Sequence, residues 1–192
     1  KKKNFDYILF GNVSDLSSKY SEALLSKIFE IKKKGLTKKI GVSIYSPNDL
    51  KLIFSKFIPH IIQAPLNIFD NRLIKSKWFK ILIKKKIPIQ IRSIFLQGLL
   101  LKDVEILKKK KISKKILYHI KKFENWVNFN NLNKLNVCLQ FIKKKRGIQI
   151  VTIGADNIDN IKQILKLLKN RKKIIIKNFS TTQLDVIDPR RW

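Results

Sequence analysis

Short apolar segments alternate with amphipathic segments along this chain. Runs of four to six mostly apolar residues have the length of buried strands, and they occupy residues 5–10, 40–44, 60–63, 87–92 and 148–153. Between them, apolar residues recur at the three- and four-residue spacing of a helix face. This spacing predicts helices within 14–34 and over 46–56, 73–86, 114–123, 132–144 and 157–169.

The alternation predicts an α/β fold in which parallel strands are joined by right-handed crossover helices. Such a set of strands fits part of a (β/α)8 barrel or a small open sheet, and periodicity alone leaves both open. Local signals predict two helix ends: Gly35 ends the first helix, and Ser46 caps the second with Pro47 at its first position. We expect one domain over 1–192, with a less regular tail over 170–192.

Composition narrows the class of protein. With 192 residues and 44% hydrophobic residues, the chain is long and apolar enough to fold. The sequence contains no Met, so we expect that Lys1 is not a native start and that the chain was cut or read from an incomplete gene. No apolar run has the roughly 18 residues of a membrane helix. Cys138 is the single cysteine, which excludes an internal disulfide and favours the cytoplasm, and it forms no recognised metal spacing with His60 and His119.

The formal charge of +30 invites a nucleic-acid interpretation. Proteins that recognise phosphates and base edges rely on Arg, whose planar guanidinium forms two parallel hydrogen bonds to one group. Here only six of the 43 basic residues are Arg, at 72, 92, 146, 171, 190 and 191. Lys, Ile, Asn and Phe together are what A/T-rich codons supply, so compositional drift on solvated faces is the preferred interpretation. A specific nucleic-acid or membrane partner is not expected.

Five local motifs, in order, resemble the aldo-keto reductase family. They are KIGVSIYS at 39–46, IQAPLNIFD at 62–70, RSIFLQGLL at 92–100, VTIGADNIDNIKQIL at 151–165 and LDVIDPRRW at 184–192. The last is similar to the tail of a bacterial subgroup found beside surface-polysaccharide genes. The resemblance covers about Asp6 to Trp192. It implies a partial (β/α)8 TIM barrel, with strands 4–8 and their helices present and the first three βα units absent.

The resemblance also implies a function. Complete members of this family use NADP or NAD to reduce an aldehyde or ketone, which in the subgroup could be a sugar. The family's catalytic Asp, Tyr and Lys come from the absent units. Gly11 stands where the catalytic His is expected, and glycine has no group to polarise a carbonyl or orient a substrate; nor does the chain supply an identifiable proton donor for the developing alkoxide. We therefore expect no turnover from these 192 residues, and no metal.

Residues in four segments match the family's cofactor contacts. Ser43 and Gln63 match positions that hold the nicotinamide carboxamide. Arg92 stands where many members carry a stacking aromatic residue, and a guanidinium can stack or meet the pyrophosphate. The remaining matches surround the pyrophosphate (Ser93, Phe95, Gln97, Gly98) and the adenosine phosphate (Gly154, Ala155, Asn160).

Each assignment has a structural alternative. Ser43 could fill a barrel layer, Arg92 could form a structural ion pair, and Asp156 could be a helix N-cap. Because Asp156 is acidic, a preference for NADP over NAD does not follow. At the level of function, the alternatives to a reductase fragment are a non-catalytic nucleotide-binding member, which Gly11 favours, and a basic nucleic-acid-binding protein. An incomplete barrel would also leave its first and last strands as open edges prone to aggregation.

Overall fold

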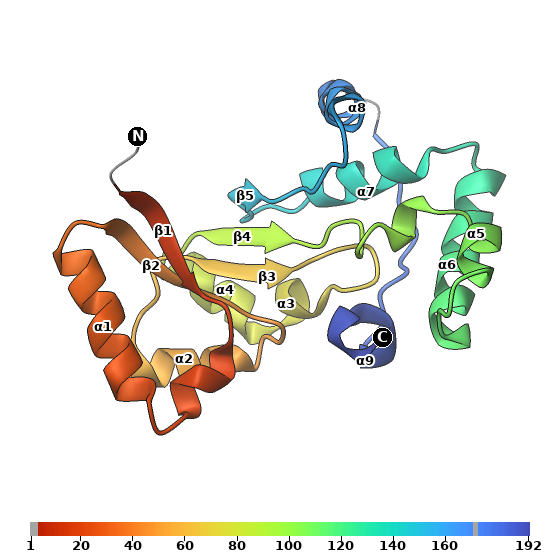
Figure 1. Ribbon diagram of the computed structural model, residues 1–192. Coiled ribbons are helices and arrows are strands. Elements are labelled where there is room, and N and C mark those ends of the chain that lie inside the picture. Colours follow the sequence, from red (N-terminus) through yellow and green to blue (C-terminus); the bar gives the residue numbers. More distant parts are fainter. Residues whose placement is uncertain (1–3, 171–172) are drawn as a thin grey trace. The chain divides into compact units, whose positions relative to one another are not determined.

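A computed structural model describes residues 4–170 and 173–192 and divides into two compact units (Figure 1). Unit 1 comprises the described residues up to Pro65, together with Arg72–Arg92 and Gly147–Val151. Unit 2 comprises Leu66–Asn71, Ser93–Arg146 and Thr152–Trp192.

Unit 1 is built on a parallel sheet. Its described strands pair in chain order, β1-β2-β3-β4-β5, and every pairing is parallel. The strands are β1 (Phe5–Phe10), β2 (Thr37–Ser43), β3 (Ile62–Pro65), β4 (Ile89–Arg92) and β5 (Ile150–Val151). Three helices lie on the same face of the sheet: α1 (Ser21–Lys33), α2 (Asp49–Lys56) and α4 (Lys77–Lys84) (Figure 1). This arrangement is expected, because successive strands are added in one direction and right-handed crossovers then place their helices on one face. The 3-10 helix η1 (Val13–Ser17) and the short α3 (Arg72–Lys75) complete the unit.

The central strands of unit 1 are fully buried on one face, whereas Gln63, Gln90 and Arg92 on the other face are half-buried. Ile40, Val42, Ile62, Ile89 and Ile91 are all fully buried. The prediction that the first strand is also buried was wrong, because Phe5 is 67% exposed and Tyr7 is 37% exposed. Among the described residues β1 pairs only with β2, so one edge of β1 has no strand against it.

Unit 2 is helical. It contains η2 (Leu99–Leu101), α5 (Val104–Lys108), α6 (Lys114–Phe129), α7 (Lys134–Lys143), α8 (Ile158–Lys169), α9 (Leu184–Ile187) and η3 (Pro189–Arg191). An aromatic cluster forms part of its core: the Phe123 ring lies 6.2 Å from that of Phe69 and 5.4 Å from that of Phe179, which also contacts Trp126 at 5.4 Å. A partly buried ion pair joins Lys134 Nζ of α7 to the Glu124 carboxylate of α6 at 2.5 Å.

Several elements begin, end or break at residues other than those predicted. The predicted helix over 73–86 is interrupted at Ser76, whose hydroxyl donates to the Leu73 carbonyl at 2.7 Å. Ser46 is not the cap of α2; Asn48 is the N-cap, and the Ser46 hydroxyl instead accepts from the Asn48 N–H at 3.2 Å. The third strand runs over Ile62–Pro65, two residues later than predicted, and α5 was not predicted at all.

Candidate functional site

In unit 1, two predicted cofactor residues meet across neighbouring strands. Ser43 ends β2, and the sheet register pairs it with Gln63 of β3. The Ser43 hydroxyl donates to Gln63 Oε1 at 2.9 Å. Because this bond uses the amide oxygen, the amide nitrogen of Gln63 is oriented as a donor. A carboxamide ligand needs such a donor for its own carbonyl oxygen, so this pair fits the predicted role.

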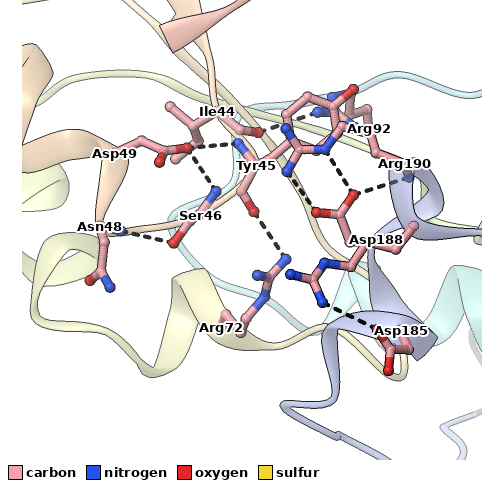
Figure 2. A network of polar contacts seen from close by, with 11 residues as sticks. Ile44, Tyr45, Ser46, Asn48, Asp49, Arg72, Arg92, Asp185, Asp188 and Arg190 are labelled. Atoms are coloured by element: carbon pink, nitrogen blue, oxygen red, sulfur yellow. Dashed lines mark hydrogen bonds and ion pairs between the residues drawn. The ribbon is translucent and has the colours of Figure 1, made fainter. Parts of the chain in front are cut away.

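Arg92 ends β4 and reaches across to the residues that follow β2 (Figure 2). Its Nη2 donates to the Ile44 carbonyl at 3.2 Å, and its guanidinium carbon lies 4.3 Å from the centre of the Tyr45 ring. This is the geometry of a cation–π contact. The guanidinium thus stacks on a ring of the protein itself, and its predicted contact with the nicotinamide or the pyrophosphate stays a prediction.

A second arginine binds the same turn. Arg72, at the start of α3, donates from Nη2 to the Tyr45 carbonyl at 3.0 Å (Figure 2). The N–H groups of Tyr45 and Ser46 both donate to the Asp49 carboxylate, at 3.0 and 2.9 Å. The turn after β2 is therefore fixed on its carbonyl side by two guanidinium groups and on its amide side by one carboxylate.

Gly11 directly follows β1, and Phe10 of β1 pairs with Val42 of β2. Gly11 is exposed, and a Cβ added to it would lie more than 4 Å from every described atom outside its chain neighbours. The backbone therefore leaves room for a Cβ at this position. The sequence has glycine at this position, and the structure shows that no steric constraint requires a glycine there.

In unit 2, the loop over residues 93–98 has an unusual backbone. Ser93, Leu96 and Gln97 have φ values of 59°, 48° and 55°, which non-glycine residues rarely adopt, and Gly98 follows at 79°. The amide of Asn67 donates to the Ser93 carbonyl at 3.1 Å and holds the loop's first residue. Such strain is characteristic of ligand-binding turns. The Phe95 side chain is 9% exposed, so any contact it makes with a cofactor would come from its backbone.

The predicted adenosine residues lie at the start of α8, also in unit 2. Gly154 and Ala155 are exposed, and Asn160 is half-buried. The N-cap of α8 is Asn157, whose side chain accepts from the Asn160 N–H at 2.9 Å, so the alternative role of Asp156 as the cap is wrong.

Asp188 joins the last two helical elements of unit 2, as the C-cap of α9 and the N-cap of η3. Its buried carboxylate accepts from Nε and Nη2 of Arg190 at 2.9 and 2.6 Å (Figure 2). Nearby, a pocket of about 590 Å³ is lined by residues of 111–116 together with Asp185, Arg191 and Trp192. None of its lining residues is a predicted cofactor contact.

The titratable groups offer little for catalysis. Burial raises the pKa of the Cys138 thiol to about 12, so it is inert at neutral pH. His60 lies two residues before β3, and its Nε2 lies 2.6 Å from Lys32 Nζ. The described residues contain no group of three or more His, Cys, Asp or Glu side chains that could hold a metal ion. No described helix is long and apolar enough to cross a membrane.

Sequence reasoning missed three residues that form or fix the turn after β2: Tyr45, on whose ring Arg92 stacks, Asp49 and Arg72. One signal could have found Arg72. Most basic residues of this chain are Lys, and compositional drift would be expected to replace Arg by Lys wherever either cation is sufficient. An Arg that remains therefore indicates a position that needs the guanidinium group itself. No comparable signal marked Asp49.

A parallel α/β sheet with polar residues at the carboxyl ends of its strands defines the class of this protein. Comparison with known proteins gives the family. The model of the aldo/keto reductase family matches residues 3–180, and the chain therefore belongs to this family of oxidoreductases, whose members generally bind NAD(P)H. No curated protein matches the chain.

Solved structures agree with this fold. The chain is similar to aldo-keto reductase AKR11C1 from Bacillus halodurans in its apo form, with a TM-score of 0.63, 15% identity and coverage of 96% of this chain and 60% of that one. The holo form of the same protein matches with a TM-score of 0.59, 16% identity and coverage of 89% and 56%. The chain thus spans about 60% of the length of the solved structures it matches.

Proposed function

We propose that this chain is part of an NAD(P)H-dependent reductase of aldehydes or ketones, and that these 192 residues alone carry out no turnover. The proposal includes the partial barrel implied by the motifs: strands 4–8 with their helices, lacking three βα units. The observation that carries it is the hydrogen bond between Ser43, the last residue of β2, and Gln63 of β3. A sugar is the first substrate to test, and the cytoplasm is the proposed location.

The residues of each unit have separate tasks in this proposal. In unit 1, Gln63 donates to the nicotinamide carboxamide while Ser43 holds its amide in orientation. Arg92 and Arg72 add positive charge for an anionic part of the cofactor. In unit 2, Ser93, Gln97 and Gly98 offer backbone groups to the pyrophosphate, and Gly154, Ala155 and Asn160 contact the adenosine phosphate. When bound, the cofactor supplies the hydride.

Binding of NADPH tests this assignment. The Gln63→Ala variant should bind NADPH about tenfold more weakly than the unaltered chain, the cost of one well-placed hydrogen-bond pair. Gln163→Ala removes an exposed glutamine of α8 and serves as the matched control, which should change affinity less than twofold. Titrations at both physiological and high salt separate this contact from the general attraction of a +30 chain for anions. An equal loss of NADPH affinity in both variants would contradict the assignment of Gln63 to the nicotinamide carboxamide.

A second candidate function, a non-catalytic nucleotide-binding member of the family, is favoured by Gly11. The structure leaves room for a side chain at this position, so histidine could be accommodated. A coupled assay with NADPH and an aldehyde or a reducing sugar should show no turnover for the 192-residue chain, and turnover above background would overturn the proposed inactivity. In a longer polypeptide that carried Asp, Tyr and Lys at the family positions, Gly11→His should raise turnover if the enzyme is weakened only by the missing side chain.

A further inference from the structure

Polar side chains follow one another along the half-buried face of the unit 1 sheet. Ser43 of β2 is hydrogen-bonded to Gln63 of β3, and the register pairs Gln63 with Gln90 of β4. Paired residues of neighbouring strands face the same side of a sheet, as do residues two apart on one strand. Arg92, two residues after Gln90, therefore lies on the same face as Ser43 and Gln63, at the carboxyl end of its strand.

The guanidinium group of Arg92 is fixed directly beyond the pair of Ser43 and Gln63. Although Arg92 belongs to β4, its guanidinium contacts Ile44 and Tyr45, the two residues that follow Ser43 (Figure 2). Since β3 lies between β2 and β4, this side chain spans the strand that carries Gln63. The hydrogen bond to the Ile44 carbonyl and the stacking on the Tyr45 ring hold the charge in place. Gln63, Tyr45 and Arg92 are half-buried, so each keeps a surface that a ligand can contact.

This arrangement puts a positive charge beside the ring of the proposed cofactor. In the proposed function Gln63 donates to the nicotinamide carboxamide, which is bonded directly to the ring. Each residue of a strand adds only about 3.3 Å, so a ring held at Gln63 lies close to a guanidinium fixed just after Ser43. Arg72 and Arg92 bind the carbonyl side of the turn and the Asp49 carboxylate binds its amide side, so positive charge exceeds negative charge among these three groups.

The two redox forms of the cofactor differ in charge at this ring. The oxidised nicotinamide ring is positively charged and the reduced ring is neutral, whereas the phosphates are the same in both forms. A guanidinium held beside the ring therefore repels the oxidised form and not the reduced one. We propose that Arg92 makes the site selective for the reduced cofactor. This inference rests on the proposed function and deepens it, because oxidised cofactor left after carbonyl reduction would dissociate more readily.

The affinities of the 192-residue chain for NADPH and NADP⁺ provide the test. NADPH fluorescence gives the first dissociation constant, and displacement of bound NADPH by NADP⁺ gives the second. Raised salt screens the general attraction of a +30 chain for the more negative NADPH. NADPH should bind about tenfold more tightly than NADP⁺, because two like charges about 5 Å apart weaken binding about fourfold in bulk water and more strongly at a half-buried site.

Three variants assign the selectivity to Arg92. Arg92→Gln removes the charge and should lower the ratio of the NADP⁺ to the NADPH dissociation constant by about tenfold. Arg92→Lys keeps the charge and should keep this ratio within about threefold of the unaltered chain. Lys84→Gln is the matched control: it removes one positive charge from the exposed last residue of α4, before β4 begins, and should change the ratio by less than about twofold. Circular dichroism melts verify that each variant folds.

Gln63→Ala separates this inference from the proposed function. Both redox forms carry the carboxamide, so this variant should weaken both alike and leave the ratio unchanged. If Gln63→Ala weakens binding but Arg92→Gln leaves the ratio as it was, the proposed function stands and the selectivity assigned to Arg92 is wrong. A ratio near one in the unaltered chain has the same meaning, since the charge of Arg92 would then not act on the ring. If neither form binds, or Gln63→Ala has no effect, the proposed cofactor site is itself wrong and the inference with it.

Discussion

At the scale of single residues, Gly41 shows how closely two strands approach. A Cβ at Gly41 would lie 2.4 Å from both the carbonyl oxygen and the Cγ2 of Ile61, far inside van der Waals contact. The backbone of β2 therefore cannot carry a larger residue here unless the chain before β3 moves. That segment also leads to Gln63, so a change at Gly41 would disturb the candidate site as well as the fold.

We expect Gly41→Ala to reduce the free energy of unfolding by about 2 to 3 kcal/mol, in the range of overpacked core substitutions. Gly11→Ala is the matched control, because its added methyl meets open space, and we expect a change within about 0.5 kcal/mol. Urea unfolding of both variants measures the difference. A Gly41→Ala variant as stable as the Gly11→Ala variant would contradict the close approach.

His119 gives the chain a pH dependence at the residue scale. Partial burial lowers the pKa of this histidine, an effect that the nearby Lys122 reinforces and a hydrogen bond with Gln183 opposes. A depressed pKa means that the unfolded chain takes up the proton first as pH falls. The stability that this group contributes is therefore complete above its ordinary pKa near 6.5 and declines as pH falls through the lower, folded value.

Denaturant unfolding at a series of pH values from neutral to mildly acidic should show this decline, and the His119→Gln variant should show a smaller one. The replacement keeps a polar side chain of similar length and removes the titration. Identical pH profiles for the two proteins would mean that His119 is not the group responsible.

At the scale of elements, Lys134 ties three helices of unit 2 together. From the first turn of α7 it binds Glu124 of α6 at 2.5 Å and Asp103, the N-cap of α5, at 2.7 Å. The Lys134 and Glu124 side chains are only 12% and 15% exposed. Glu124 also accepts from the Val104 N–H at 3.3 Å, so it orders the start of α5.

Lys134→Met should destabilise the chain by about 3 kcal/mol, because it leaves the half-buried Glu124 carboxylate without its cation. The double variant Lys134→Met, Glu124→Gln removes both charges and should recover a large part of the loss. Thermal unfolding of the three proteins gives the coupling. A double variant no more stable than the single one would show that packing at Lys134, and not the ion pair, accounts for the effect.

The elements that sequence predicted well are those whose signal is local. The strand over 5–10 and the helix over 157–169 needed only apolar runs and spacing, and both were confirmed within a residue at each end. The break at Ser76 and the late start of α2 at Asp49 depend on side-chain hydrogen bonds that a hydrophobic pattern does not encode. The motifs predicted Ser43 and Gln63, and the structure brings them into contact. They did not predict Arg72, whose partner is a carbonyl 27 positions away.

At the scale of the whole molecule, the open edge of β1 governs how the chain behaves in solution. The strand has exposed Phe5 and Tyr7 and, among the described residues, a partner on one side only. Unpaired strand edges with apolar side chains template association with other chains. The charge of +30 opposes that association at low salt, and salt screens it.

We therefore expect aggregation of the chain to increase with salt, and Phe5→Lys with Tyr7→Lys to suppress it. Light scattering and size-exclusion chromatography across a salt series follow the effect. Phe129→Lys with Ile175→Lys, at residues 87% and 93% exposed in unit 2, is the matched control and should protect less. Equal protection by both double variants would mean that added charge, and not the β1 edge, is decisive.

The six glycines carry a consequence for the history of this sequence. Glycine codons begin with two guanines, so mutation toward adenine and thymine tends to erase them. Gly35, Gly98 and Gly147 have positive φ, and Gly41 has no space for a methyl group, so selection for folding keeps these four. Neither constraint applies to Gly11 or Gly154: neither has a positive φ, and the described atoms leave space for a Cβ at both. Because the resemblance implies histidine at the position of Gly11, only Gly154 can report on binding: homologous sequences should lose Gly154 first wherever no nucleotide is bound.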